Sequence, residues 1–295
     1  MKKSISLFIL VMLVISISGY AQSEMALKRK VAIGRFSNET QYAKSVFYDK
    51  ENDPMGKQAG DILSTRLAAS EKFLLIERQD YDKIVNELNT SGGFSQNIGA
   101  DYLIIGSITE YGRKNIGTQK VFSSSKEQIV EAGVSVRLVD VSTGIIIYSG
   151  EAKGEAAAED KRVMGFGKTA DFDATLSDKA ISAAISKLVE NIINSCMDKP
   201  WKAYILSVED GTYIISGGKS QGIKEGDTFT VMEKGKMVKN PQTGLHIELP
   251  GKTAGTVRIG QTMGSTPEDE ISIASLVDGT IDTGSLEKYY IVEKK

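Results

Sequence analysis

The group of residues closest to a chemical motif is Gly218-Lys219-Ser220, which matches the end of a phosphate-binding loop. In such a loop, backbone amides and the lysine hold phosphate, and the motif requires a glycine five residues before Gly218. Tyr213 stands at that position, and no strand-then-helix pattern surrounds it. The sequence therefore predicts an exposed turn between two strands here, and not a nucleotide site.

Histidine and acidic residues give no second candidate for catalysis. His246 is the only histidine, in a predicted loop, and one histidine makes neither a histidine-based metal cluster nor a triad. The acidic pair Asp171 and Asp173 falls in a predicted loop. The pair Asp80 and Asp82 falls on a predicted exposed helix face, so solvation explains both pairs. We therefore expect a protein that is not an enzyme, with no catalytic residue, no metal site and no cofactor.

The secondary structure is predicted most clearly from Phe73 to Leu88, where the spacing of the hydrophobic residues changes. Phe73–Ile76 is a nearly continuous apolar run, which is typical of a buried strand. Apolar residues then recur at helical spacing and predict a helix with one buried stripe. This stripe consists of Tyr81, Ile84, Val85 and Leu88. A strand that leads directly into a helix indicates an α/β unit.

Further strands are predicted on both sides of this unit. Lys30–Phe36 and Tyr102–Ile108 are short and apolar. Gln128–Val141 and Gly144–Gly154 are long, and the turn chemistry at Thr143-Gly144 favours a hairpin between them. Together with the strand described above, they predict a mixed sheet.

Two further helices are predicted to pack on this sheet. Asp53 before Pro54 favours a helix start, because the carboxylate accepts from free amides and proline suits the first helical position. The stripe of this helix is Ala59, Ile62, Leu63 and Leu67. Thr175 with Asp178 resembles a capping box at the start of a long helix. Its stripe is Ile181, Ile185, Leu188, Ile192 and Cys196. Cys196, the only cysteine, is therefore predicted to be a core thiol.

The hydrophobic pattern changes at Pro200-Trp201. Beyond this point short strands alternate with glycine turns, which is typical of a small barrel or sandwich. The predicted strands are Ala203–Val208, Thr212–Ser216, Thr228–Glu233, Gly255–Ile259 and Ile271–Val277. The predicted fold class is α/β (α+β): a mixed sheet with packed helices over residues 22–199, then a small all-β barrel-like domain over residues 200–295.

The first 21 residues are predicted to be a secretory signal peptide. Lys2-Lys3 is followed by the apolar run Ile5–Ile17 and by Ala21 at the expected cleavage site. No cysteine stands there, so we expect an exported protein of the periplasm or outer membrane without a lipid anchor. Cleavage would leave 34 basic and 38 acidic side chains. This mild negative charge, with no basic stripe, argues against a nucleic-acid partner.

Several stretches resemble the curli-secretion channel family, the CsgG-like proteins. They are FSNET at 36–40, LIERQDYDKIVNE at 75–87, GADYLIIGSI at 99–108 and VRLVDVSTG at 136–144. The resemblance covers about residues 30–194 and implies a periplasmic α/β domain that forms a ring. Residues 217–227, with Asn240 to Gly244, resemble the small C-terminal β domain of the flagellar assembly protein FlgT.

The resemblance also implies a site in the loop after the first strand. In CsgG-like channels this loop narrows the pore with a Tyr-x-x-x-Asn-Phe pattern. Here Tyr42 and Phe47 keep that spacing, and Val46 replaces the asparagine. These three residues are the candidate pore constriction, where a ring of aromatic side chains would contact an unfolded chain. The alternative is that Tyr42 and Phe47 fold back onto the domain.

Two segments correspond to the membrane-crossing hairpins of the channel family, and neither has an apolar band. Arg113–Ala132 is interrupted by the polar run Ser123–Gln128, and Ala152–Asp173 offers mainly alanine and glycine to one face. Lipid-facing strand positions need apolar side chains. We therefore expect a water-soluble form or peripheral outer-membrane association rather than a full membrane-crossing structure built by this chain alone.

The sequence supports two functional hypotheses. The first is a CsgG-like envelope protein of a curli-type secretion and assembly apparatus, a homo-oligomeric ring that passes or docks exported polypeptide. The second is a soluble periplasmic interaction module that resembles the lipoproteins which activate penicillin-binding proteins and binds an envelope protein partner. The oligomer size separates the two hypotheses.

Overall fold

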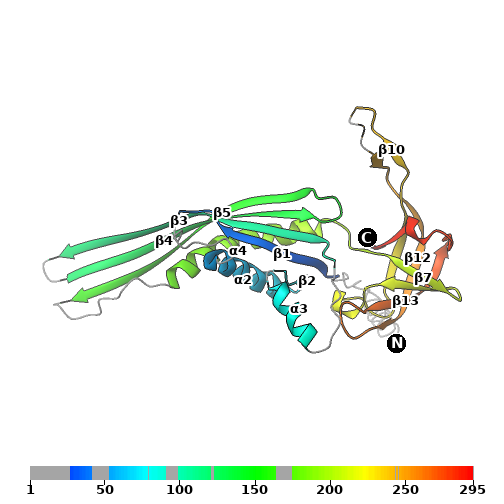
Figure 1. Ribbon diagram of the computed structural model, residues 1–295, viewed down its shortest axis with the longest axis horizontal. Helices are drawn as coiled ribbons and strands as arrows, with labels where there is room; N and C mark the ends of the chain where they lie inside the picture. Colours follow the sequence, from blue (N-terminus) through cyan, green and yellow to red (C-terminus); the bar gives the residue numbers. More distant parts are fainter. Residues whose placement is uncertain are drawn as a thin grey trace, which may run out of the picture.

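The computed structural model describes residues 27–41, 53–78, 80–90, 99–120, 123–163, 175–242, 244 and 246–294 of the 295-residue chain. Their strands form a five-stranded sheet, a seven-stranded sheet and a two-stranded hairpin, and the two larger sheets follow one another along the long axis (Figure 1). In chain order the elements are β1 (Arg29–Asn38), α2 (Pro54–Ala69), β2 (Phe73–Ile76), α3 (Tyr81–Thr90), β3 (Tyr102–Lys120), β4 (Ser123–Asp140), β5 (Ile146–Val163), α4 (Thr175–Met197), β6 (Lys202–Ala203), β7 (Ile205–Glu209), β8 (Thr212–Ser216), η1 (Lys219–Gln221), β9 (Thr228–Glu233), β10 (Met237–Lys239), β11 (His246–Glu248), β12 (Lys252–Met263), β13 (Ile271–Gly279), η2 (Leu286–Lys288) and β14 (Tyr289–Glu293).

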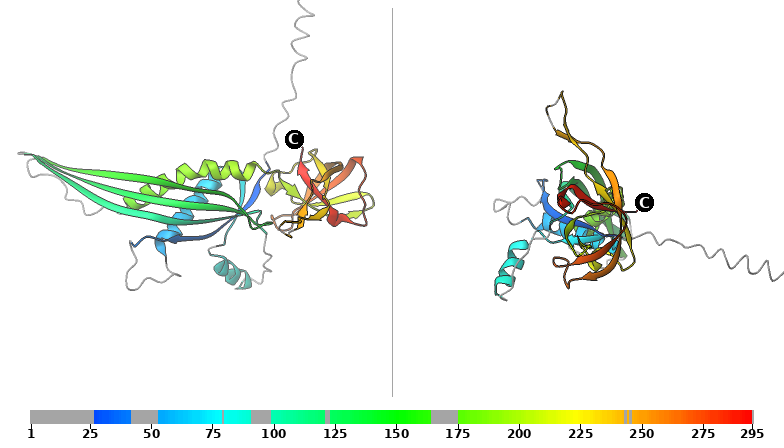
Figure 2. Two further views of the ribbon diagram at one scale, coloured as in Figure 1. Left: turned by 90° about the horizontal axis from the view of Figure 1, so that it is seen from above. Right: turned by 90° about the vertical axis from the view of Figure 1, so that its right-hand side faces the viewer.

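The five-stranded sheet is mixed and has the order β2-β1-β3-β4-β5. β1 runs parallel to both of its neighbours, so that Val31 lies beside Leu75 on one side and Tyr102 on the other. β3, β4 and β5 are antiparallel to one another. The helices α2 and α4 pack on one face of this sheet (Figure 2). The predicted mixed sheet with packed helices is confirmed.

The apolar stripes predicted for α2 and α4 form the core between the helices and the sheet. Asp53 caps α2, because its Oδ1 accepts a hydrogen bond from the Gly56 amide at 2.8 Å. Ala59, Leu63 and Leu67 are fully buried. The buried face of α4 consists of Leu176, Ala180, Ile181, Ala184, Ile185, Leu188, Ile192 and Cys196. No helix in the described ranges is long and apolar enough to cross a membrane.

Both views of Figure 2 show the helix α3 apart from α2 and α4. Ile84, predicted to face the core, is 41% exposed, so that part of the predicted stripe is wrong. The physical reason is that α2 and α4 fill the helix-bearing face of the sheet, which leaves no place for a third stripe on that face. At the start of α3, Lys57 Nζ lies 3.2 Å from Asp80 Oδ2. The side chains of Tyr81 and Leu88 lie outside the described part.

The strands β3, β4 and β5 are 18 or 19 residues long and extend beyond α2 and α4 as a three-stranded arm (Figure 1). We define this arm as residues 110–120, 123–133 and 153–163. Its base, at Tyr111 and Gly154, still lies against α4, and the rest extends beyond the helices. The polar run Ser123–Gln128, predicted to interrupt the hairpin, belongs to β4, where Lys126 lies between Gly117 and Asp160. The run is paired on both sides because backbone hydrogen bonds hold a central strand whatever its hydrophobicity, and its polar side chains still interrupt the apolar residues of the predicted hairpin.

The seven-stranded antiparallel sheet has the order β6-β14-β9-β12-β13-β8-β7 and is nearly closed. Its two end strands, β6 and β7, follow one another in the chain with only Tyr204 between them. The rings of Trp201 and Phe229 lie inside, with centroids 5.4 Å apart. The buried core is completed by Leu27, Ala203, Ile205, Tyr213, Ile215, Ile223, Val231, Val257, Ile259, Ala274, Ile281, Tyr289 and Ile291. The predicted barrel-like β fold is confirmed.

Arg29 is buried where the two sheets meet. Its guanidinium donates to the carbonyls of Leu27 at 3.1 Å and Lys199 at 3.0 Å, and it forms an ion pair with Glu293 at 2.9 Å. Glu293 also accepts a hydrogen bond from the Trp201 amide at 3.0 Å. Arg29 thus joins β1, the end of α4 and β14. The division of the chain at residues 199 and 200 stays a prediction.

β10 and β11 form a hairpin that projects sideways from the seven-stranded sheet (Figure 1). Lys239 pairs with His246, so His246 lies in an exposed strand and the predicted loop is wrong at this residue. The tip turn explains the error: the Gly244 amide donates to the Asn240 carbonyl at 2.8 Å, and Gly244 has φ +73°. A turn this tight sends the chain straight back and allows pairing where the sequence offers little strand pattern.

Candidate functional site

The predicted pore-constriction residues, Tyr42, Val46 and Phe47, lie outside the described residues, in the segment 42–52 between β1 and α2. The described residues on either side of this segment are joined, because the Asn38 amide donates to Asp53 Oδ2 at 2.5 Å. Asn38 of β1 and Asp53 at the start of α2 therefore lie next to each other. The role of the three residues stays a prediction.

The side of the arm that faces away from α4 carries a row of charged side chains. Glu110 and Lys153 flank Gly133 in the strand register and form an ion pair at 2.5 Å. Gly133 has no side chain, so these two residues can reach each other over the central strand. The hydrogen bond that the Lys153 ammonium donates to Glu110 raises the pKa of this ammonium. Both side chains are more than half exposed, which leaves the pair open to a partner.

The next row toward the tip of the arm places two like charges side by side. Glu131 and Glu155 are cross-strand partners, and both are exposed. Lys187 of α4 reaches the same region, where its Nζ donates to the Lys153 carbonyl at 2.6 Å. The surface hollow here has a volume of about 510 Å³ and is lined by Glu110, Tyr111, Gly112, Glu131, Ala132, Lys153, Gly154, Glu155 and Lys187. We call this region the arm surface. It can bind charged and polar groups, and its lining holds no serine, cysteine or histidine.

Sequence reasoning missed the arm surface. The charged residues were visible on one face of the alternating strand, but the strand register that brings Glu110 and Lys153 together was not. Gly133 was the signal that could have been used. A glycine within a strand often marks a place where another group approaches closely.

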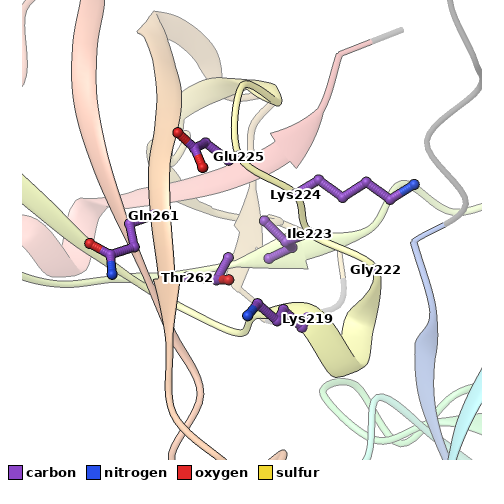
Figure 3. Close-up of a pocket in the computed structure, with 7 residues that line it drawn as sticks. All are labelled: Lys219, Gly222, Ile223, Lys224, Glu225, Gln261 and Thr262. Atoms are coloured by element: carbon purple, nitrogen blue, oxygen red, sulfur yellow. The ribbon is translucent and has the colours of Figure 1, made fainter.

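A second hollow, of about 460 Å³, lies on the seven-stranded sheet (Figure 3). It is lined by Lys219, Gly222, Ile223, Lys224, Glu225, Gln261 and Thr262. It lies beside the part of β12 that follows Arg258, the last residue of β12 that pairs with β9. Figure 3 shows Ile223 close to Thr262 and the Lys224 side chain directed away from them. This mixture of charged, polar and apolar groups can support binding.

The residues that match the end of a phosphate loop form a turn, as the sequence predicts. The Ser220 amide donates to Glu270 Oε2 at 2.9 Å, and the Ser220 hydroxyl donates to Glu270 Oε1 at 2.9 Å. A Cβ on Gly218 would lie 2.9 Å from the Cβ of Glu270. A carboxylate of the chain itself therefore occupies the position that a phosphate would need.

Two groups near the junction of the sheets have shifted pKa values. Burial raises the pKa of the Cys196 thiol to about 12, which fits the predicted core thiol. Burial also acts to raise the pKa of Asp140, but hydrogen bonds from Lys199 and Ser142 outweigh it and hold this pKa at about 2. Lys199 Nζ lies 2.8 Å from Asp140 Oδ2.

Across the described residues, no three His, Cys, Asp or Glu side chains are placed to hold a metal ion.

These features define a protein of two large sheets with an exposed charged surface on a long strand arm. The family model "Curli production assembly/transport component CsgG" matches residues 14–226. Because this match covers well over half of the chain, the protein belongs to the CsgG family.

A relative from Neisseria meningitidis serogroup B, NMB1126/NMB1164, carries a lipoprotein name and is 31% identical over 189 residues, which are 63% of this chain and 84% of the relative. The PelC dodecamer from Paraburkholderia phytofirmans is 19% identical, covers 55% of this chain and 87% of its own, and has a TM-score of 0.29. Lipoprotein GNA1162 from Neisseria meningitidis is 16% identical, covers 58% of this chain and 99% of its own, and has a TM-score of 0.28. At these scores the structural likenesses carry no argument about function.

Proposed function

We propose that this protein is an envelope component of a curli-type secretion or assembly apparatus, which forms a ring of identical copies and passes or docks an exported polypeptide. Membership of the CsgG family supports the general role. The observation that carries the specific proposal is the arm, in which three paired strands extend past the helical layer and present an open charged surface.

Assembly into a ring is supported by the uncovered face of the five-stranded sheet. α2 and α4 cover one face, and the other carries half-buried apolar side chains, including Leu103, Ile105 and Val139. Ile146, which lies beside Val139 in the register, is 49% exposed. A sheet face that carries uncovered apolar side chains is typical of a protein surface that another molecule covers. Identical copies packed side by side would cover it.

Contact with an exported polypeptide is supported by the charges of the arm surface. Glu131 and Glu155 lie directly opposite one another, and like charges in that position destabilise a sheet unless a partner neutralises them. An extended polypeptide that carries basic side chains supplies both the charge and the hydrogen-bonding groups. We also propose that any association with the outer membrane is peripheral, because the charged arm surface offers no apolar band to lipid. The chemistry required is binding alone, with no catalytic step, metal or cofactor.

Light scattering of the mature protein tests the ring. We expect a mass several times that of the 32.0 kDa precursor, unchanged over a tenfold dilution. A monomer at all concentrations would contradict the proposal and favour the soluble interaction module instead.

The charge reversal Glu131→Lys with Glu155→Lys should weaken binding of a basic peptide and leave the mass unchanged. Lys114→Glu, on the same arm but outside the hollow, is the control.

The predicted constriction is tested in the same assembly. If Tyr42 and Phe47 surround the passage, replacing both with alanine should increase ion conductance through a reconstituted ring while the mass stays the same. Val46→Ala is the control, because it changes little volume at the neighbouring position. A loss of folding stability of several kcal/mol, the cost of truncating buried aromatic side chains, would show instead that Tyr42 and Phe47 belong to a core.

A further inference from the structure

The β10–β11 hairpin is a separate surface that the family match does not include, because the match ends at residue 226. Three pairs of residues hold it together: Met237 with Glu248, Val238 with Ile247, and Lys239 with His246. The Leu249 amide also donates to the Lys236 carbonyl at 3.0 Å. A two-stranded hairpin on its own is marginally stable in water. A contact along one of its faces would therefore stabilise it.

One face of this hairpin is apolar and uncovered. Side chains alternate between faces along a strand, so Val238, Ile247 and Leu249 share a face, and Met237 lies on the other. These four side chains are 37%, 47%, 43% and 57% exposed, respectively. The tip residues Pro241 and Gln242 are exposed and are not large apolar side chains. The apolar residues thus run along the side of the hairpin, which suits lateral contact with a protein surface.

The hairpin is also basic, whereas the remainder of its sheet is acidic. Residues 234–252 contain four lysines and one glutamate, a net charge of +3. Residues 201–233 and 253–295 contain twelve acidic and seven basic side chains, a net charge of −5. Some of the acidic residues stand near exposed apolar side chains: Asp278 follows Val277, which is 55% exposed, and Glu268 lies in the turn after Met263, which is 47% exposed. The two surfaces are complementary in charge, and both offer apolar contacts.

We propose that the β10–β11 hairpin docks on the acidic seven-stranded sheet of a second copy of this chain. The inference rests on the proposed ring, in which neighbouring copies lie side by side, and the hairpin projects sideways from the long axis (Figure 1). A stable protein interface buries about 1,200–2,000 Å² in total, more than three partly exposed aliphatic side chains can supply. The hairpin contact therefore adds to the interface between the five-stranded sheets and links adjacent copies at the other end of the molecule.

Zero-length carbodiimide cross-linking tests this contact directly, because it joins a lysine to a carboxylate only when they touch. The protein is used as an equal mixture of unlabelled and nitrogen-15-labelled full-length mature chains, so that mass spectrometry separates links between copies from links within one. We expect links between copies from Lys236 or Lys239 to acidic residues of the seven-stranded sheet such as Glu268 and Asp278. Links from these lysines only within one chain would overturn the proposal.

Charge reversal supplies the second measurement. Lys236→Glu with Lys239→Glu places like charges in the contact, so we expect the concentration at which the ring dissociates to rise by about tenfold or more. Lys202→Glu with Lys288→Glu makes the same charge change on exposed lysines of β6 and η2, outside the hairpin and the hollow beside β12, and should leave that concentration unchanged. Equal behaviour of the two variants would overturn the proposal.

The outcomes separate this inference from the proposed function. A ring that persists without hairpin links overturns the hairpin contact alone. Hairpin links between copies in an assembly that stops at a dimer support the contact and contradict the ring, whereas a monomer contradicts both.

Flotation with vesicles of phosphatidylglycerol and phosphatidylethanolamine tests whether the hairpin binds a lipid surface instead. If the hairpin variant loses vesicle binding and keeps its mass, the hairpin binds lipid, and the contact between copies is overturned.

Discussion

The five-stranded and seven-stranded sheets bury their apolar side chains in different ways. The first places α2 and α4 on one face and leaves the other face open. The second curves until its end strands β6 and β7 nearly meet, so that its apolar face lies inside and surrounds Trp201 and Phe229. A sheet that closes on itself needs no helices, but it also leaves no broad apolar face outside.

The difference explains where each part of the molecule can bind. The open sheet offers a whole face and an arm that continues it beyond the helices. The closed sheet offers only what projects from it or lies in its surface, namely the β10–β11 hairpin and the hollow beside β12. The open sheet is therefore suited to carry the main interface of an assembly, and the closed sheet to add a smaller contact.

The largest effect is expected at the junction of the two sheets. Arg29→Met removes the buried guanidinium and leaves the Lys199 carbonyl and the Glu293 carboxylate without this partner. We expect a loss of about 3–5 kcal/mol in the free energy of unfolding, the usual cost of breaking a buried ion pair by removing one member. Urea unfolding measures this loss with two probes: far-ultraviolet circular dichroism follows the whole chain, and fluorescence of Trp201, the only tryptophan, follows the closed sheet.

The same experiment tests whether the two sheets unfold together. If Arg29 couples them, the two probes should give one transition in the unchanged protein and separate transitions in the variant. Arg35→Met is the control, because Arg35 and Glu39 are both exposed, 3.8 Å apart, and such a pair contributes about 0–1 kcal/mol. Separate transitions in the unchanged protein would show that the sheets are independent despite Arg29.

The sequence predicted those parts of the fold that depend on local pattern. The stripes of α2 and α4 were predictable because a helix repeats its buried side every 3.6 residues, and Cys196 took its place in that repeat. The α3 stripe has the same period, yet Ile84 is exposed. Amphipathic spacing indicates a helix, but whether its apolar face finds a surface depends on which elements have already covered the sheet.

Features that depend on pairing between distant segments could not be predicted. Ser123–Gln128 is polar, and only its two partner strands make it part of β4. Arg29 and Glu293 are 264 residues apart, and nothing in either local sequence indicates that they meet. The arm surface has the same origin, because Glu110 and Lys153 meet only through the register of three strands.

A smaller effect is expected where α4 lies against the open sheet. A Cβ on Gly154 of β5 would overlap the Ala180 carbonyl oxygen and the Ala184 amide of α4. Gly154→Ala should therefore push the helix away and cost about 1–3 kcal/mol, as overpacking usually does. Gly112→Ala is the matched control on the same arm, because a Cβ there meets no described atom within 4 Å. Equal unfolding free energies for the two variants would mean that α4 does not pack tightly on β5, and that the helical layer is looser than the closed core.

The smallest effect is expected from the side chain of Lys199, whose backbone carbonyl already accepts from Arg29. Its ammonium binds Asp140 at 2.8 Å and helps to hold the pKa of that carboxyl at about 2, below its ordinary value of 3.8. A lowered carboxyl pKa stabilises the folded state above the ordinary value, and this stabilisation is lost as the pH falls from about 4 toward 2.

Lys199→Met should therefore lower the free energy of unfolding at pH 7 by no more than about 1 kcal/mol, because the lysine is 46% exposed and solvent screens the pair. The difference between the variant and the unchanged protein should shrink as the pH falls from 4 to 2, since Asp140 is then protonated in both. Urea unfolding at pH 7, 4 and 2.5 measures this difference. A difference that stays constant over this range would show that the lysine acts through packing at the junction rather than through its charge, and would leave the Arg29 contacts as the link between the open and closed sheets.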